Sequence, residues 1–94
     1  MRHAKRVDAN QDQIIIALRA AGANVWIISL PVDLLVGYKG HTFLVEIKRT
    51  AKSRFTPLQQ DFFESWGGGT LARIDSPDAA LRMIGVLHET QTNE

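Results

Sequence analysis

The most restrictive feature of the sequence is a pair of runs that alternate between apolar and polar residues on either side of Lys39-Gly40. Residues 33–37 (DLLVG) precede this dipeptide, and residues 42–48 (TFLVEIK) follow it. Such alternation is typical of β-strands, and a two-residue connection between the runs predicts an antiparallel hairpin. In the second run one face receives Phe43, Val45 and Ile47, and the other receives Thr42, Leu44, Glu46 and Lys48.

The remaining segments predict helices and strands that surround this hairpin. We expect a helix over about 10–21, a buried strand over 25–30, a helix over 57–66, a strand over 70–74 and a final helix from residue 76. Thr56 and Gln59 form a capping box around Pro57 at the start of the second helix. The order αβββαβα predicts an α/β fold, with a mixed four-stranded sheet flanked by helices and a C-terminal helix.

The length of 94 residues allows one domain, which we place at 8–87 between a basic N-terminal arm (1–9) and a polar tail (88–94). The large aromatic side chains are expected to build its core; they are Trp26, Phe43, Phe62, Phe63 and Trp66. The chain has no cysteine, no apolar segment near the N-terminus and no apolar run of ~20 residues. We therefore expect a cytoplasmic protein that does not enter a membrane.

Charge is distributed unevenly along the chain. Up to Arg54 there are nine Lys and Arg against four Asp and Glu, whereas from Phe55 onward there are two against six. One side of the molecule could therefore face phosphate groups, although solvated surface charge remains the default explanation for most of these side chains.

Asp33 and Glu46 become neighbours if the hairpin turns tightly at Lys39-Gly40. Tyr38 then pairs with His41, and counting outward from this pair puts Asp33 opposite Glu46 on the same face. Opposed carboxylates have Cβ atoms ~4.5–5.5 Å apart and destabilise a sheet. A divalent cation removes the repulsion, and Mg²⁺ usually takes one or two carboxylates from a protein. A shift by one residue would place the two acids on opposite faces.

Lys48 follows Glu46 by two residues and therefore shares its face. An ammonium group there can orient a metal-bound water or neutralise a phosphate in the transition state. Two acids, a metal ion and a lysine suit phosphodiester hydrolysis. Plainer interpretations remain open, because a half-exposed strand gives the same alternation and Lys48 can form an ordinary surface ion pair worth ~0–1 kcal/mol.

Asp33 and, thirteen positions later, Glu46-Ile47-Lys48 resemble the D…(D/E)-x-K motif of the PD-(D/E)XK nuclease superfamily. The expected αβββαβ order is similar to the restriction-endonuclease-like core of that superfamily. With the TPLQ helix start, the glycine run and the SPDAALRMIG segment, the chain resembles a stand-alone VRR-NUC domain over about residues 8–86. Domains of this kind are often encoded by phages and prophages.

This resemblance implies a Mg²⁺- or Mn²⁺-dependent endonuclease that cuts DNA without a nucleotide cofactor. Stand-alone members resemble homodimeric Holliday-junction resolvases, which implies branched DNA as the partner. Asp33 and Glu46 carry over as metal ligands, the backbone carbonyl of Ile47 as a further ligand, and Lys48 as the catalytic lysine. Gln59 matches a glutamine of the helix after the motif, and its capping-box role is an equally good explanation of this residue.

The sequence departs from the family pattern in two places. The family usually has proline directly before the first acid, whereas Val32 here separates Pro31 from Asp33. Many relatives also have a glutamate in the first helix as an additional metal ligand. The matching position is Asn10, with Asp12 or Gln13 nearby, and an asparagine carbonyl would add no charge.

Basic residues on two segments are candidate DNA contacts: Arg49, Lys52 and Arg54 after the catalytic strand, and Lys5 and Arg6 in the arm. Each phosphate contact would make DNA affinity fall with salt. Two other functions remain open, a non-catalytic DNA-binding module on the same fold and an interaction domain whose two acids are surface residues. Saturable binding of Mg²⁺ or Mn²⁺ would distinguish the nuclease from the interaction domain.

Overall fold

The hairpin around Lys39-Gly40 lies at the centre of the sheet. The computed structural model describes residues 9–48 and 55–88. Strand β2 (Leu34–Tyr38) pairs antiparallel with β3 (His41–Ile47), from Tyr38 opposite His41 to Leu34 opposite Val45. The predicted register is therefore confirmed. Lys39 and Gly40 have φ angles of 48° and 83°, and positive φ at both central residues is what a type I′ connection requires.

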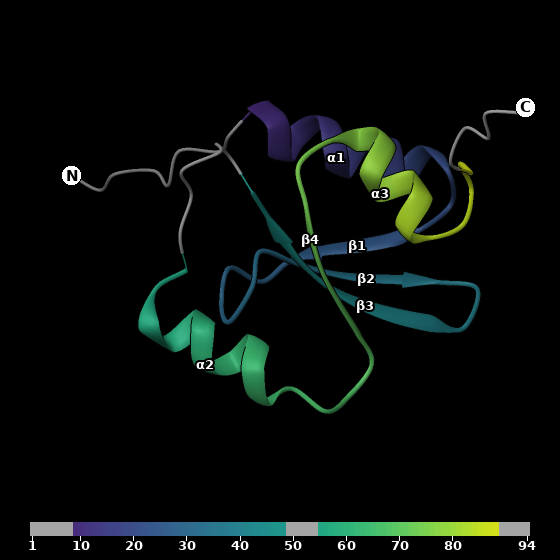
Figure 1. Ribbon diagram of the computed structural model, residues 1–94. Helices are drawn as coiled ribbons and strands as arrows, with labels where there is room; N and C mark the ends of the chain where they lie inside the picture. Colours follow the sequence, from purple (N-terminus) through teal and green to yellow (C-terminus); the bar gives the residue numbers. More distant parts are fainter. Residues whose placement is uncertain (1–8, 49–54, 89–94) are drawn as a thin grey trace, which may run out of the picture.

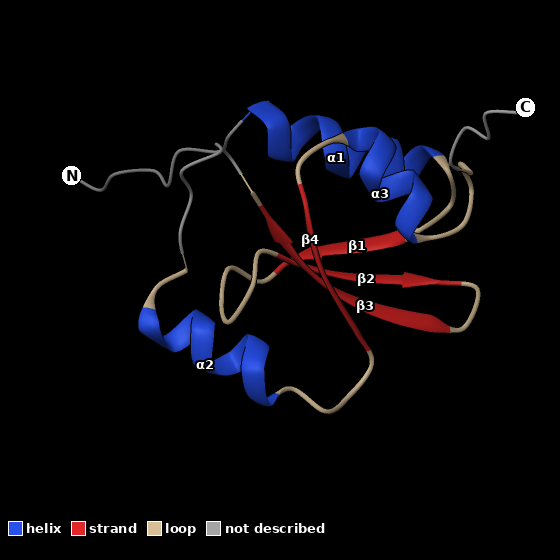
Figure 2. Ribbon diagram, viewed as in Figure 1, coloured by secondary structure: helices blue, strands red, loops and turns tan. Residues whose placement is uncertain are grey.

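Two further strands complete the sheet. Strand β1 (Asn24–Ile27) pairs antiparallel with β2, and β4 (Thr70–Ile74) pairs parallel with β3, which gives the order β1-β2-β3-β4 (Figure 2). The predicted α/β fold with a mixed four-stranded sheet is confirmed. Because β4 runs parallel to β3, these two strands end at the same edge of the sheet.

The prediction of a buried strand over 25–30 was wrong in both length and burial. Strand β1 ends at Ile27. The Ile28 N–H still donates to the Asp33 carbonyl oxygen in the register of β1 and β2, but Ser29 has a φ of 70° and its N–H donates to the same oxygen, which ends the regular pairing. The strand is also the outermost one of the sheet, next to β2 alone, and Trp26 is 69% exposed.

The helices cover the two faces of the sheet unequally. Helix α1 (Ala9–Ala20) and helix α3 (Pro77–Met83) lie together on one face, and α2 (Pro57–Ser65) lies on the other (Figure 1). The predicted C-terminal helix is present, and Gly85 follows it with a φ of 86°. The arm up to residue 8, the segment 49–54 and the tail from residue 89 lie outside the described residues.

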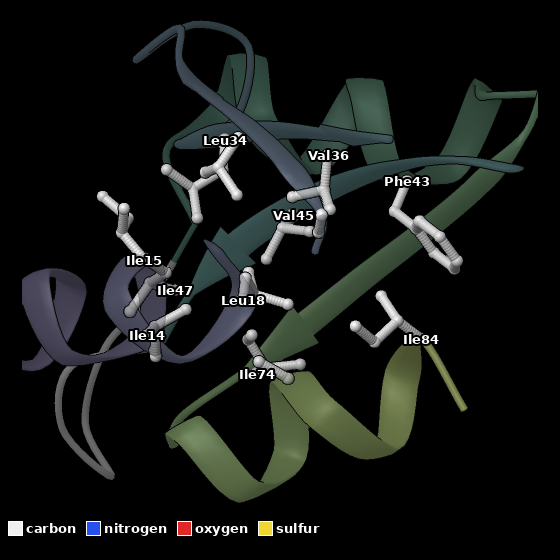
Figure 3. Packing of buried hydrophobic residues seen from close by; sticks show 13 residues of the cluster. Ile14, Ile15, Leu18, Leu34, Val36, Phe43, Val45, Ile47, Ile74 and Ile84 are labelled. Carbon is white, nitrogen blue, oxygen red and sulfur yellow. The ribbon is translucent and has the colours of Figure 1, made fainter. Parts of the chain in front are cut away.

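The core lies between the sheet and the α1–α3 pair (Figure 3). Its side chains are mostly aliphatic, and the fully buried ones include Ile14, Leu18, Leu34, Val36, Val45 and Ala80. The expectation of an aromatic core was wrong except for Phe43, because α2 buries none of its residues. On the other face of the sheet the rings form a chain of contacts, from Phe55 to Phe63, from Phe63 to Phe62 and from Phe62 to Trp66.

Among the described residues, no helix has the length and apolar character needed to cross a membrane.

Candidate active site

The candidate site lies where three strand ends meet. Asp33 directly precedes β2, Glu46 and Ile47 end β3, and β4 ends beside them. Because β2 runs opposite to β3, the start of β2 lies next to the end of β3. Val32 and Leu34 are fully buried on either side of Asp33. Alternation along the strand therefore turns the Asp33 side chain to the face opposite the core, where α2 lies.

Asp33 is held to β3 by its carboxylate. Main-chain pairing of the hairpin ends at Leu34 and Val45, and beyond it Asp33 Oδ2 accepts a hydrogen bond of 2.8 Å from the Ile47 N–H. The N–H and C=O groups of one strand residue point toward the same neighbouring strand. The Ile47 carbonyl therefore points toward Asp33. It lies on the side of β3 from which it could bind the same cation as the Asp33 carboxylate.

Glu46 is the more buried of the two acids, with 8% of its surface exposed. Its Oε1 atom is buried, and its Oε2 atom accepts a hydrogen bond of 3.3 Å from Gln59 Nε2. A buried carboxylate is costly unless hydrogen bonds or a cation compensate for lost hydration. The bond from Gln59 supplies part of this compensation and also links α2 to the sheet.

Gln59 forms the predicted capping box and also contacts Glu46, while a catalytic role for it stays a prediction. Its Oε1 atom accepts a 3.1 Å hydrogen bond from the Thr56 N–H, and the Thr56 hydroxyl accepts from the Gln59 N–H at 3.2 Å. This is the predicted capping box. The other end of the same amide donates to Glu46. The start of α2 therefore orients the amide that contacts the candidate metal ligand.

Lys48 continues the pairing of β3 with β4 by one residue. Its N–H donates to the Ile74 carbonyl oxygen at 2.7 Å, and its side chain is half-buried. The alternation that buries Val45 and Ile47 on the core face puts Lys48 on the Glu46 face. The structure thus brings the predicted residues Asp33, Glu46, Lys48 and Gln59 to one face and one edge of the sheet.

The first-helix residue Asn10 has a different contact. Its Nδ2 atom donates to the Asp75 carbonyl oxygen at 3.1 Å, which ties α1 to the connection between β4 and α3. A metal-binding role for its carbonyl oxygen stays a prediction. The polar residue of this turn that points inward is Gln11, which is 6% exposed, whereas Asp12 and Gln13 are exposed. Helical spacing places Gln11 on the stripe of Ile14, and this signal was available in the sequence.

The predicted DNA contacts Arg49, Lys52, Arg54, Lys5 and Arg6 all lie outside the described residues. Their role stays a prediction.

The donor atoms at the sheet edge fit a small hard cation. In the described part of the chain, no three His, Asp or Glu side chains gather closely enough to hold a metal ion by themselves. Asp33 and Glu46 with the Ile47 carbonyl form a partial oxygen set. Such a set suits Mg²⁺, which usually keeps several waters and binds substrate phosphate as well as one or two carboxylates.

Arg73 is a neighbour of the site that the sequence did not indicate. It pairs with Glu46 across β3 and β4, and its guanidinium carbon lies 4.3 Å from the centre of the Phe55 ring. Alternation in residues 70–74 separates Arg73 from the core residue Ile74, but it does not reveal which strand lies alongside β4.

The fold and site define an α/β protein with two carboxylates and a lysine at one edge of a mixed sheet. Comparison of the chain with models of protein families, with curated proteins and with solved structures gives no match.

Proposed function

We propose that the protein is a Mg²⁺- or Mn²⁺-dependent DNA endonuclease that hydrolyses phosphodiester bonds. The observation that carries the proposal is the placement of Asp33 and Glu46 on one face at adjoining strand ends, with the Asp33 carboxylate fixed to the Ile47 N–H. A protein selected only for stability gains nothing from two neighbouring acids of which one is almost buried. A phosphodiester-cutting site gains a cation-binding position from the same arrangement.

Each residue of the site has a distinct part in the proposed reaction. Asp33, Glu46 and the Ile47 carbonyl would hold the cation, which supplies an activated water and stabilises negative charge on the phosphate. Gln59 keeps the Glu46 carboxylate oriented through its 3.3 Å hydrogen bond. The Lys48 ammonium group would neutralise charge that develops on the phosphate in the transition state.

The preferred substrate in this proposal is branched DNA such as a Holliday junction, cut by a homodimer. The motif and element order that resemble stand-alone VRR-NUC domains support this part. Symmetric cutting of a junction also requires two active sites, and a two-fold dimer supplies them in the correct relation.

Isosteric variants test the site without removing its hydrogen bonds. Asp33→Asn retains an oxygen that can accept from the Ile47 N–H, and Glu46→Gln retains an acceptor for Gln59, so both should fold. We expect each to lower the cleavage rate by on the order of 10²-fold or more, and Lys48→Met to do the same. The control is Asp78→Asn, which changes an exposed acid on α3 in the opposite layer and should cleave like the wild type.

The measurement is cleavage of labelled four-way junction, flap, single-stranded and duplex DNA with Mg²⁺, Mn²⁺ or EDTA. Paired metal-dependent cuts in the junction would support both the chemistry and the substrate. Cleavage of flaps or single strands alone would retain the chemistry and exclude the resolvase role. A folded wild-type protein that binds DNA but cuts none of these substrates would contradict the nuclease and favour a DNA-binding module.

A further inference from the structure

Arg73 lies beside the acid pair, on the opposite side of Glu46 from Asp33. It is paired with Glu46 in the parallel register of β3 and β4, and paired residues of neighbouring strands project from the same face. The core residue Ile74 follows it and points to the other face. Arg73 is exposed to solvent, so it presents a cationic side chain on the same face of the sheet as the two acids.

An aromatic platform holds the Arg73 side chain in place. Its guanidinium carbon lies 4.3 Å from the centre of the Phe55 ring, and that ring stacks on Phe63 with 4.4 Å between centroids and 28° between planes. Contact with an aromatic face orients the guanidinium group, and where the two planes are parallel its N–H donors point outward. Phe55 directly precedes the Thr56 cap of α2. Arg73 is therefore positioned by the same helix start that positions Gln59 against Glu46.

Charge at this edge of the sheet is acidic among the described residues. The carboxylates of Asp33, Glu46 and Asp75, the last directly after β4, outnumber the cationic groups of Lys48 and Arg73. Without Arg73 this part of the site would be more negative before a metal ion binds, and it would repel a polyanion more strongly. A planar guanidinium also matches phosphate geometry with two parallel hydrogen bonds, which the Lys48 ammonium cannot make.

We propose that Arg73, supported by Phe55, binds a backbone phosphate of the DNA strand next to the bond that is cut. This inference rests on the proposed nuclease function and adds a substrate-binding residue to its site. The competing explanation is structural: Arg73 offsets the charge of the neighbouring acids and does not touch DNA.

The salt dependence of DNA binding distinguishes these two roles. We would measure binding of labelled four-way junction and duplex DNA in EDTA, over a range of salt concentrations, by fluorescence anisotropy. Arg73→Gln should weaken binding about tenfold and reduce the slope of log affinity against log salt by about 1, as expected for one lost phosphate contact. The matched control, Arg82→Gln on α3, should retain the wild-type slope.

Two gentler variants test the geometry and guard against misfolding of Arg73→Gln. Arg73→Lys keeps the charge but loses the planar fork, so it should keep the slope and bind more weakly. Phe55→Leu keeps Arg73 but removes its platform, so it should also bind more weakly at an unchanged slope. Wild-type affinity in both variants would contradict a positioned guanidinium.

The outcomes separate this inference from the nuclease proposal. If Arg73→Gln lowers the melting temperature but keeps the wild-type slope, Arg73 is structural and the inference is overturned. If the wild type binds DNA without cutting it, the nuclease proposal fails while the slope still decides the role of Arg73. If the wild type does not bind DNA in the absence or presence of Mg²⁺, both are overturned.

Discussion

Glu46 occupies a costly position for a carboxylate. It is almost buried, and a second acid lies at the neighbouring strand end. The amide nitrogen of Gln59 donates a hydrogen bond to the Glu46 carboxylate. The oxygen of the same amide accepts a hydrogen bond from the Thr56 N–H. The capping box therefore fixes which end of the amide faces Glu46. A side chain with an acceptor at both ends could satisfy the cap but not the carboxylate.

Gln59→Glu separates these two functions of the side chain. A glutamate is equally suited to the capping box, but it places a further negative charge against Glu46. In EDTA we expect the variant to be less stable than the wild type by about 1 kcal/mol or more, and the deficit should shrink with Mg²⁺ or Mn²⁺ because a cation offsets the added charge. Thermal melting with and without metal would measure both effects.

Gln60→Glu is the control for this experiment. It adds the same charge on the next residue of α2, which is exposed and whose amide donates to the Glu64 carboxylate. Losing that bond can lower the stability of the control, but the loss should not depend on metal. Equal melting temperatures for Gln59→Glu and the wild type in EDTA would argue against the contact between Gln59 and Glu46.

The helices differ in what attaches them to the sheet. Helix α1 buries a stripe of four residues, Gln11, Ile14, Ile15 and Leu18, against the strands. Helix α2 buries none and is attached through the bond from Gln59 to Glu46 and through Phe55, which contacts both Phe63 of the helix and Arg73 of β4. Stability should therefore depend mainly on α1, whereas the geometry of the site should depend on α2.

Leu18→Ala and Ile16→Ala test the contribution of α1. Leu18 is fully buried, so its truncation should lower the free energy of unfolding by about 2–5 kcal/mol, through lost burial and the cavity that remains. Ile16 is 66% exposed on the same helix, and its truncation should change stability by no more than about 0.5 kcal/mol. Urea denaturation of both variants measures the difference, and equal losses would contradict the burial assigned to α1.

At the scale of the whole molecule, the two faces of the sheet have separate tasks. One face carries the aliphatic core under α1 and α3 (Figures 1 and 3). The other face carries the acids, Gln59, Arg73 and the stacked rings. Substitutions of exposed residues on the second face can therefore change ligand binding with little effect on the core.

The proposed cutting of branched DNA predicts a dimer in solution. Light scattering during size-exclusion chromatography should give a mass of about twice the 10.5 kDa of one chain, because paired cuts require two sites that are related by symmetry. The protein should be measured over a range of concentrations, without DNA and with it. A single-chain mass under all conditions would exclude a symmetric resolvase, whereas metal-dependent cleavage by a monomer would remain possible.

Features set by a few neighbouring residues were readable from the sequence alone. The two-residue turn at Lys39-Gly40 and the alternation around it determine the hairpin register, so the proximity of Asp33 and Glu46 followed from counting. The capping box at Thr56 was equally local. The interactions behind these features span short stretches of chain, and local sequence therefore specifies them. The catalytic and metal-binding roles of these residues stay predictions.

Only the tertiary structure decided which elements lie side by side. The parallel pairing that brings Arg73 to Glu46 joins strands on either side of the whole α2 crossover. Trp26 is exposed because β1 is the outermost strand of the sheet. The double role of Gln59 likewise needed the distance from α2 to the sheet. Residue type and periodicity describe one segment at a time. Contacts between distant segments depend instead on how all the apolar faces can be buried together.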